Sequence, residues 1–171
     1  ERLHRGWYDR SGRWVEGDGE DRLVLVFSHH NSWTMDNHLE DEHDPGIRTG
    51  GVELVSLFRR FPNVVLWANG HSHEHRVLHH PGVVVGTGLW EVDTASGIDF
   101  GQQGRTFELL DNRDGTLSIL ATVLDHLGPP EVPHRRDGGW TTAELASISR
   151  ELSANDDRWI DPIALLGGPE D

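Results

Sequence analysis

Two short apolar runs separated by a helical pattern mark the first half of the chain. Residues 23–27 and 64–68 are continuous apolar segments, which is typical of strands buried on both faces of a parallel sheet. Between them, residues 52–61 carry apolar side chains at helical spacing, and Pro62 ends the segment. This order of strand, helix and strand predicts a right-handed crossover between two parallel strands, and hence an α/β fold.

The remaining pattern predicts hairpins, surface loops and one more helix. A loose hairpin is expected around Ser11, and the polar residues 29–51 are expected to form a surface loop. Thr141 and Glu144 have the spacing of a capping box, which predicts the start of a helix. Further strands are expected at residues 76–78, 83–85, 105–111 and 116–124, the last two joined as a hairpin by a turn rich in Asn, Asp and Gly.

Prolines divide the chain into a larger and a smaller part. A linker containing Pro129, Pro130 and Pro133 separates residues 1–128 from residues 129–171. The second part is expected to hold the capped helix and a tail that packs on the first part through its apolar side chains. Those of the tail are Trp159, Ile160, Ile163 and Leu165.

Composition narrows the classes of partner and of metal site. The chain of 171 residues has no cysteine, so any metal must be held by His, Asp or Glu. Its formal net charge of -14 repels polyanions, and we do not expect it to bind a nucleic acid backbone. No apolar run approaches the roughly 20 residues that span a bilayer. Because the chain begins at Glu1 we expect a segment of a longer protein, whose compartment the sequence does not indicate.

Histidines follow both predicted strands. The chain has 12 histidines, and His29 and His30 come directly after the first apolar run, whereas His71 and His73 come directly after the second. Ligands collect at the carboxyl ends of parallel strands, so these side chains are expected to meet. Side chains at i and i+2 of an extended segment share a face, which predicts that His71 and His73 point together. Neutral imidazoles that leave coordination positions open suit a divalent transition metal, although exposed loop imidazoles are the simpler interpretation.

Two of these segments resemble a known family. Residues 24–30 resemble the block of the calcineurin-like metallophosphoesterases in which an apolar strand delivers a metal-binding histidine. Residues 69–73 resemble the closing Gly-His-x-His block of the same family. Three further segments, residues 29–37, 93–100 and 105–109, resemble an actinobacterial-type branch of it.

The resemblance implies both a fold and a reaction. The fold would be the C-terminal part of a four-layer αββα sandwich. The reaction would be hydrolysis of a phosphate ester at two divalent ions (Mn, Fe or Zn) that share a bridging hydroxide. By the same resemblance, His29 and His71 bind one ion and His73 reaches toward the other. His30 would be the catalytic residue that contacts the substrate or orients a ligand, or else a packed neighbour.

The chain departs from the family by lacking its earlier motifs. An Asp-x-His, a Gly-Asp-x-x-Asp and a Gly-Asn-His block, in this order before the first histidine block, supply the bridging aspartate and asparagine ligands in the family. No such series occurs here: Gly-Asn-His is absent, and Asp-x-His occurs only after His29, at residues 36–38 and 41–43. A Gly-Asp-x-x-Asp pattern at residues 17–21 stands alone. We therefore expect the N-terminal part of the parent chain to supply them, this chain alone to be inactive, and the uncovered sheet edge to self-associate.

Two other interpretations compete with the hydrolase. One is a non-catalytic module that holds a single ion in a histidine-rich site for structure or interaction. The other, a cupin-like barrel, requires strands throughout, and the helical pattern over residues 52–61 argues against it.

Overall fold

The computed structural model describes residues 6–17, 19–20, 22–36, 42–43, 46–98, 102–131 and 138–155. The expected tail after residue 155 and most of residues 36–44 lie outside these ranges. The chain divides into two compact units, Glu1–Thr94 and Ala95–Asp171, so the boundary expected at residue 128 falls inside the second unit. Within the described residues, no helix is long and apolar enough to cross a membrane.

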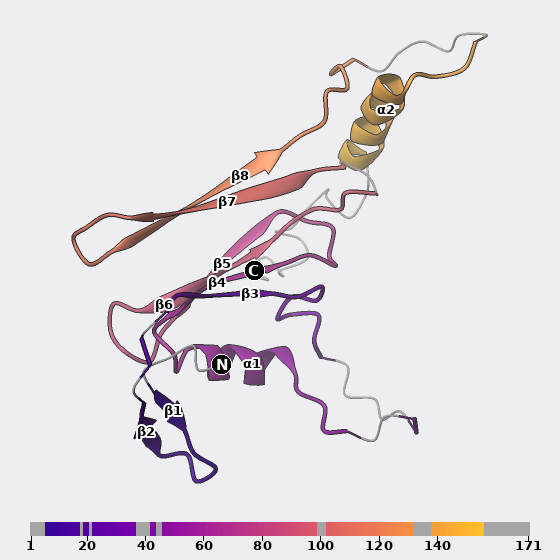
Figure 1. Ribbon diagram of the computed structural model, residues 1–171. Helices are drawn as coiled ribbons and strands as arrows, with labels where there is room; N and C mark the ends of the chain where they lie inside the picture. Colours follow the sequence, from indigo (N-terminus) through magenta and orange to yellow (C-terminus); the bar gives the residue numbers. More distant parts are fainter. Residues whose placement is uncertain are drawn as a thin grey trace, which may run out of the picture. The chain divides into compact units, whose positions relative to one another are not determined.

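The first unit contains a small hairpin and a mixed sheet with one helix (Figure 1). In the sheet the strand order is β3-β4-β6-β5, with β3, β4 and β6 parallel and β5 antiparallel to β6. The hairpin expected around Ser11 is present as the antiparallel pair β1 and β2. The elements are β1 Gly6–Tyr8, β2 Trp14–Glu16, β3 Val24–Phe27, α1 Gly51–Phe58, β4 Val64–Asn69, β5 Arg76–Pro81 and β6 Gly88–Asp93.

The predicted strand–helix–strand unit is confirmed. β3 and β4 are parallel neighbours, and α1 lies between them in the chain. Leu66 and Trp67 of β4 are buried at the centre of the sheet. Phe58 of α1 packs edge-on against Trp67 with ring centroids 5.3 Å apart, which anchors the helix to the core.

One predicted strand is wrong and another strand was not predicted. Residues 83–85 form part of the turn between β5 and β6 and expose their three valines, and among the described residues no strand pairs with them. Gly86, at a φ of 81°, takes the left-handed conformation that this turn requires. The unpredicted strand is β6, a central strand whose apolar pattern is interrupted by Glu91 and Asp93.

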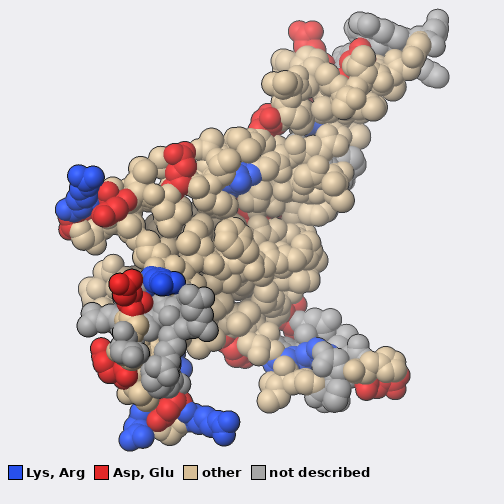
Figure 2. All heavy atoms as spheres, in the orientation of Figure 1, with Lys and Arg blue, Asp and Glu red and all other residues tan. Residues whose placement is uncertain are grey.

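The second unit contains the predicted hairpin and the predicted capped helix. β7 Gly104–Asp111 and β8 Leu117–Leu124 pair antiparallel, and Figure 2 shows acidic and basic side chains together at the tip of this hairpin. Thr141 and Glu144 form the reciprocal capping box of α2 Thr142–Ala154. Arg150 of α2 donates to the carbonyl of Gly128 at 2.9 Å and so ties the helix to the segment that follows β8. The described residues thus form a mixed α/β structure with two helices.

Candidate metal centre

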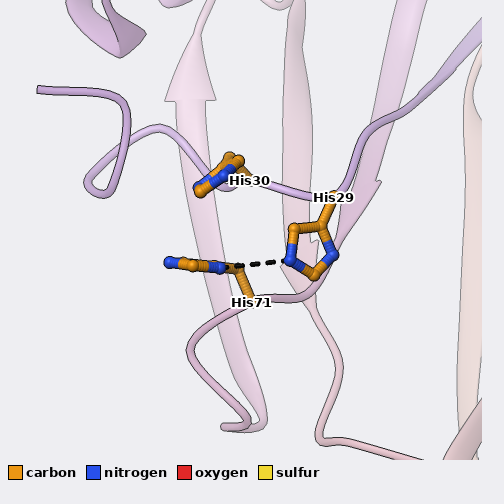
Figure 3. Close-up of side chains that lie close together, drawn as sticks. All are labelled: His29, His30 and His71. Atoms are coloured by element: carbon orange, nitrogen blue, oxygen red, sulfur yellow. Dashed lines mark hydrogen bonds between the residues drawn. The ribbon is translucent and has the colours of Figure 1, made fainter. Parts of the chain in front are cut away.

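The three histidines His29, His30 and His71 meet where β3 and β4 end (Figure 3). Nδ1 of His71 lies 3.1 Å from Nε2 of His29, and the ring centroids of His30 and His71 are 4.0 Å apart. One potential ligand atom from each ring lies within 4.8 Å of the other two. The backbone supports this approach, because the N–H of Gly70 donates to the carbonyl of His29 at 3.0 Å. The predicted convergence of the two strand ends is therefore present.

The separation of His29 and His71 suits two ligands of a single metal ion. Two nitrogens bound to one tetrahedral Zn²⁺ at about 2.0–2.1 Å lie about 3.3 Å apart. The 3.1 Å between the facing nitrogens of His29 and His71 is close to that value. All three rings are exposed, so they can rotate slightly inward and still leave coordination positions open to water. The residues present thus fit an ion held by three neutral imidazoles.

His73 lies outside this group. The expected extended conformation of residues 71–73 is wrong: His71 has a φ of 75° and His73 a φ of 58°. Both residues are therefore left-handed, a conformation that costs a non-glycine residue about 1–2 kcal/mol. The N–H of Ser72 donates to the carbonyl of Gly70 at 3.0 Å within the same tight turn. This turn removes the alternation that would have placed His73 beside His71, and His30 takes part in the group instead.

The environment of His71 favours its neutral form. Partial removal from water, followed by the neighbouring charges of His30, His29 and His73, lowers the pKa of the His71 imidazole. A metal binds only the deprotonated nitrogen, so this lowered pKa keeps a lone pair available to lower pH than in an isolated histidine. The lowered pKa also makes the stability of the fold depend on pH. The free energy of unfolding falls as pH drops below the ordinary histidine pKa, because the unfolded chain then binds the proton more readily than the native state.

A buried carboxylate lies beneath the two histidine loops. Asp93 ends β6, opposite Asn69 at the end of the parallel neighbour β4, and is completely buried. Its Oδ2 accepts hydrogen bonds from the amide of Asn31 at 3.2 Å and from the hydroxyl of Ser72. The same Asn31 amide donates to the carbonyl of Gly70 at 2.9 Å. Asn31 and Asp93 therefore connect the loop after β3 with the turn after β4.

A second buried carboxylate, Glu91, lies on the same face of β6 two residues earlier. It accepts hydrogen bonds from Ser32, Asn69 and His80. Sequence reasoning did not identify Asn31, Glu91 or Asp93. The alternation of Leu89, Glu91 and Asp93 is the available signal, because it places two acids on the face that also carries a buried leucine.

One exposed cation also belongs to this edge of the sheet. Arg76 begins β5, and its backbone pairs with Asp93 at the end of β6. Its guanidinium carbon lies 4.9 Å from the ring centroid of Trp33, in the loop that follows His30. A guanidinium stacked on an indole is held in place while its N–H donors remain able to bind an anion.

The buried position of Asp93 predicts a pH dependence of stability. Burial raises the pKa of the Asp93 carboxyl, although hydrogen bonds from Ser72, Thr94 and Asn31 act in the opposite direction. The native state then binds the proton more tightly than the unfolded chain does. The free energy of unfolding is therefore expected to fall as pH rises through the native pKa.

The measurement for this prediction is urea unfolding of the wild type and of Asp93→Asn at several pH values between about 4 and 7. The stability of the wild type relative to the variant should decline across this range. Parallel pH profiles for the two proteins would contradict the prediction.

Comparison of the chain with family models, with curated proteins and with solved structures found no match.

Proposed function

We propose that this chain carries the histidine part of the active site of a metal-dependent phosphoric ester hydrolase, within the C-terminal part of an αββα sandwich. The supporting observation is the convergence of His29, His30 and His71 from two strand ends, 42 residues apart in the case of His29 and His71. It coincides with the two segments, residues 24–30 and 69–73, that resemble the metallophosphoesterases.

Each side chain has a role in this proposal. His29, His30 and His71 hold one divalent ion, which when bound supplies Lewis-acid stabilisation of phosphoryl oxygens and a water of lowered pKa. His73 is the ligand that reaches toward a second ion. Arg76, stacked on Trp33, donates hydrogen bonds to the phosphate of the substrate. A local guanidinium matters in a chain of net charge -14, because the overall field repels a dianion.

A single-ion module is the second candidate. Its support is that the group brought together among the described residues consists of three imidazoles and includes no carboxylate. Structural zinc is closed by four protein ligands, whereas a catalytic ion keeps a position for water or substrate. If the bound metal exchanges a ligand with an added anion, the hydrolase is favoured. If four protein ligands complete the coordination of the metal, the single-ion module is favoured.

The metal-loaded chain is expected to bind orthophosphate saturably and to hydrolyse aryl phosphates poorly or not at all. Three neutral imidazoles leave the charge of two dications unneutralised. Two ions therefore cannot be held together to stabilise both the attacking and the leaving oxygen. Phosphate binding should weaken at least about tenfold, or about 1.4 kcal/mol, without metal or in Arg76→Gln.

Isothermal titration of the Zn²⁺-loaded chain with orthophosphate measures the binding, and an assay with an aryl phosphate monoester and diester measures the turnover. The matched control is Arg48→Gln, since Arg48 is an arginine of the first unit outside the site. Equal phosphate affinity with and without metal would contradict the hydrolase proposal. Rapid turnover that His71→Ala abolishes would show that the site is complete without further carboxylates.

A further inference from the structure

We propose that the buried carboxylate of Glu91 is a positioning residue that holds both histidine loops in the metal-binding arrangement. This proposal rests on the metal site described above. It concerns a residue that carries no ligand atom itself and lies on a different strand from the histidines.

The carboxylate is completely buried and accepts four hydrogen bonds. Oε1 accepts from the backbone N–H of Ser32 and from the amide of Asn69, each at 2.7 Å. Oε2 accepts from the hydroxyl of Ser32 and from Nε2 of His80, each at 2.7 Å. An ionised carboxylate has about four acceptor positions, so these four donors satisfy it.

Two of its three partner residues are close chain neighbours of the proposed ligands. Ser32 lies two residues after His30, and Asn69 lies two residues before His71. One side chain therefore fixes the loop after β3 and the end of β4 relative to each other. His80 of β5 donates to the same carboxylate and holds it in place.

The Ser32 loop is also limited by α1. A Cβ added at Gly51, the first residue of α1, would lie 1.8 Å from the carbonyl oxygen of Ser32. This close approach leaves the loop no space to move toward the helix. Ser32 is thus confined between a helix that contacts its backbone and a carboxylate that accepts two of its hydrogen bonds.

Stability alone is a weak reason for a buried carboxylate here. The desolvation of buried polar partners such as Glu91 and His80 roughly cancels the attraction between them, and apolar replacements of similar shape are often neutral or stabilising. What an apolar pair cannot reproduce is the directional hydrogen bonding to Ser32 and Asn69. Positioning of the two loops explains why a charged residue occupies the central strand.

The test compares variants of two partners of Glu91 with a control variant near the opposite end of β4. Ser32→Ala and Asn69→Ala each remove one hydrogen bond to Glu91 and leave every proposed ligand in place. The matched control is Asn63→Ala, because the Asn63 amide donates to the carbonyl of Arg22 at 2.7 Å just before the opposite end of β4. Glu91→Gln sets an amide donor against existing donors and is expected to unfold the first unit, so the two milder variants carry the test.

Zn²⁺ affinity by chelator competition, the visible spectrum of bound Co²⁺ and the thermal midpoint are measured for each protein. Ser32→Ala and Asn69→Ala are expected to lose about tenfold in Zn²⁺ affinity and to change the Co²⁺ spectrum, since residues that orient metal ligands typically contribute 10–100-fold. Asn63→Ala is expected to lower the thermal midpoint about as much as Ser32→Ala and Asn69→Ala do. Its Zn²⁺ affinity and its Co²⁺ spectrum are expected to stay those of the wild type.

The outcomes separate the two proposals. If wild-type protein binds Zn²⁺ but Ser32→Ala and Asn69→Ala bind it equally well with unchanged Co²⁺ spectra, the positioning role of Glu91 is overturned. An affinity loss of the same size in Asn63→Ala also overturns it, because the loss of Zn²⁺ affinity would then result from lower stability and not from the loss of hydrogen bonds to Glu91. If wild-type protein binds neither ion, the metal site itself is wrong.

Discussion

Replacement of His71 by alanine is expected to lower the affinity of the chain for Zn²⁺ by more than about 100-fold. His71 is the one member of the group that comes from the second strand end, and its Nδ1 lies 3.1 Å from Nε2 of His29. Without it, His29 and His30 remain as two adjacent imidazoles of one loop. Loss of a direct ligand should exceed the 10–100-fold that is typical of residues that only orient ligands. The measurement is competition with a chelator of known affinity near neutral pH.

The control for this prediction is another exposed histidine of the first unit. His43 lies outside the group and its side chain is 87% exposed, so His43→Ala is expected to bind Zn²⁺ like the wild type. His73→Ala is expected to lose less affinity for the first ion than His71→Ala does. Equal affinities of wild type and His71→Ala would show that the ion is held elsewhere.

Replacement of Trp67 by alanine is expected to destabilise the first unit by about 3–5 kcal/mol, the usual cost of deleting a large buried aromatic side chain. Trp67 is 1% exposed in the central strand β4. Its ring packs against Phe58, and its Nε1–H donates to the hydroxyl of Ser28 at 2.7 Å. That hydroxyl in turn donates to the carbonyl of His30 at 2.6 Å, so the loss also loosens the histidine loop.

Urea unfolding followed by far-ultraviolet circular dichroism measures this effect. Trp67→Phe keeps most of the apolar ring and removes the N–H donor, and it is expected to lose about 1–3 kcal/mol. A loss below about 1 kcal/mol in Trp67→Ala would mean that the packing between α1 and the sheet contributes little.

The strands that the sequence predicts correctly are marked by a continuous apolar run or by a recognisable turn. Residues 64–68 lie in β4, a central strand that is covered on both faces. Residues 24–27 form β3 as predicted, but β3 is an edge strand and Phe27 is 69% exposed, so the expected burial on both faces is wrong there. The pattern could not indicate β6, since Glu91 is stabilised there by Ser32, a partner 59 residues away. Local sequence does not contain such a partner, and a glutamate is rarely fully buried without one.

The sequence predicts which strand ends form the candidate site. Parallel strands deliver their following residues to one edge, so the meeting of His29 with His71 follows from topology. Which further histidine joins them depends on backbone dihedrals. The positive φ values of His71 and His73 are unusual for non-glycine residues, and the sequence contains no signal for them.

A crystal structure of the Zn²⁺-loaded chain, with the ion located by its anomalous scattering, tests the proposed metal site. We predict one principal site with ring nitrogens of His29, His30 and His71 at about 2.0–2.1 Å and a remaining position open to water or phosphate. An ion bound without His29 or without His71, or closed by four protein ligands, would contradict it.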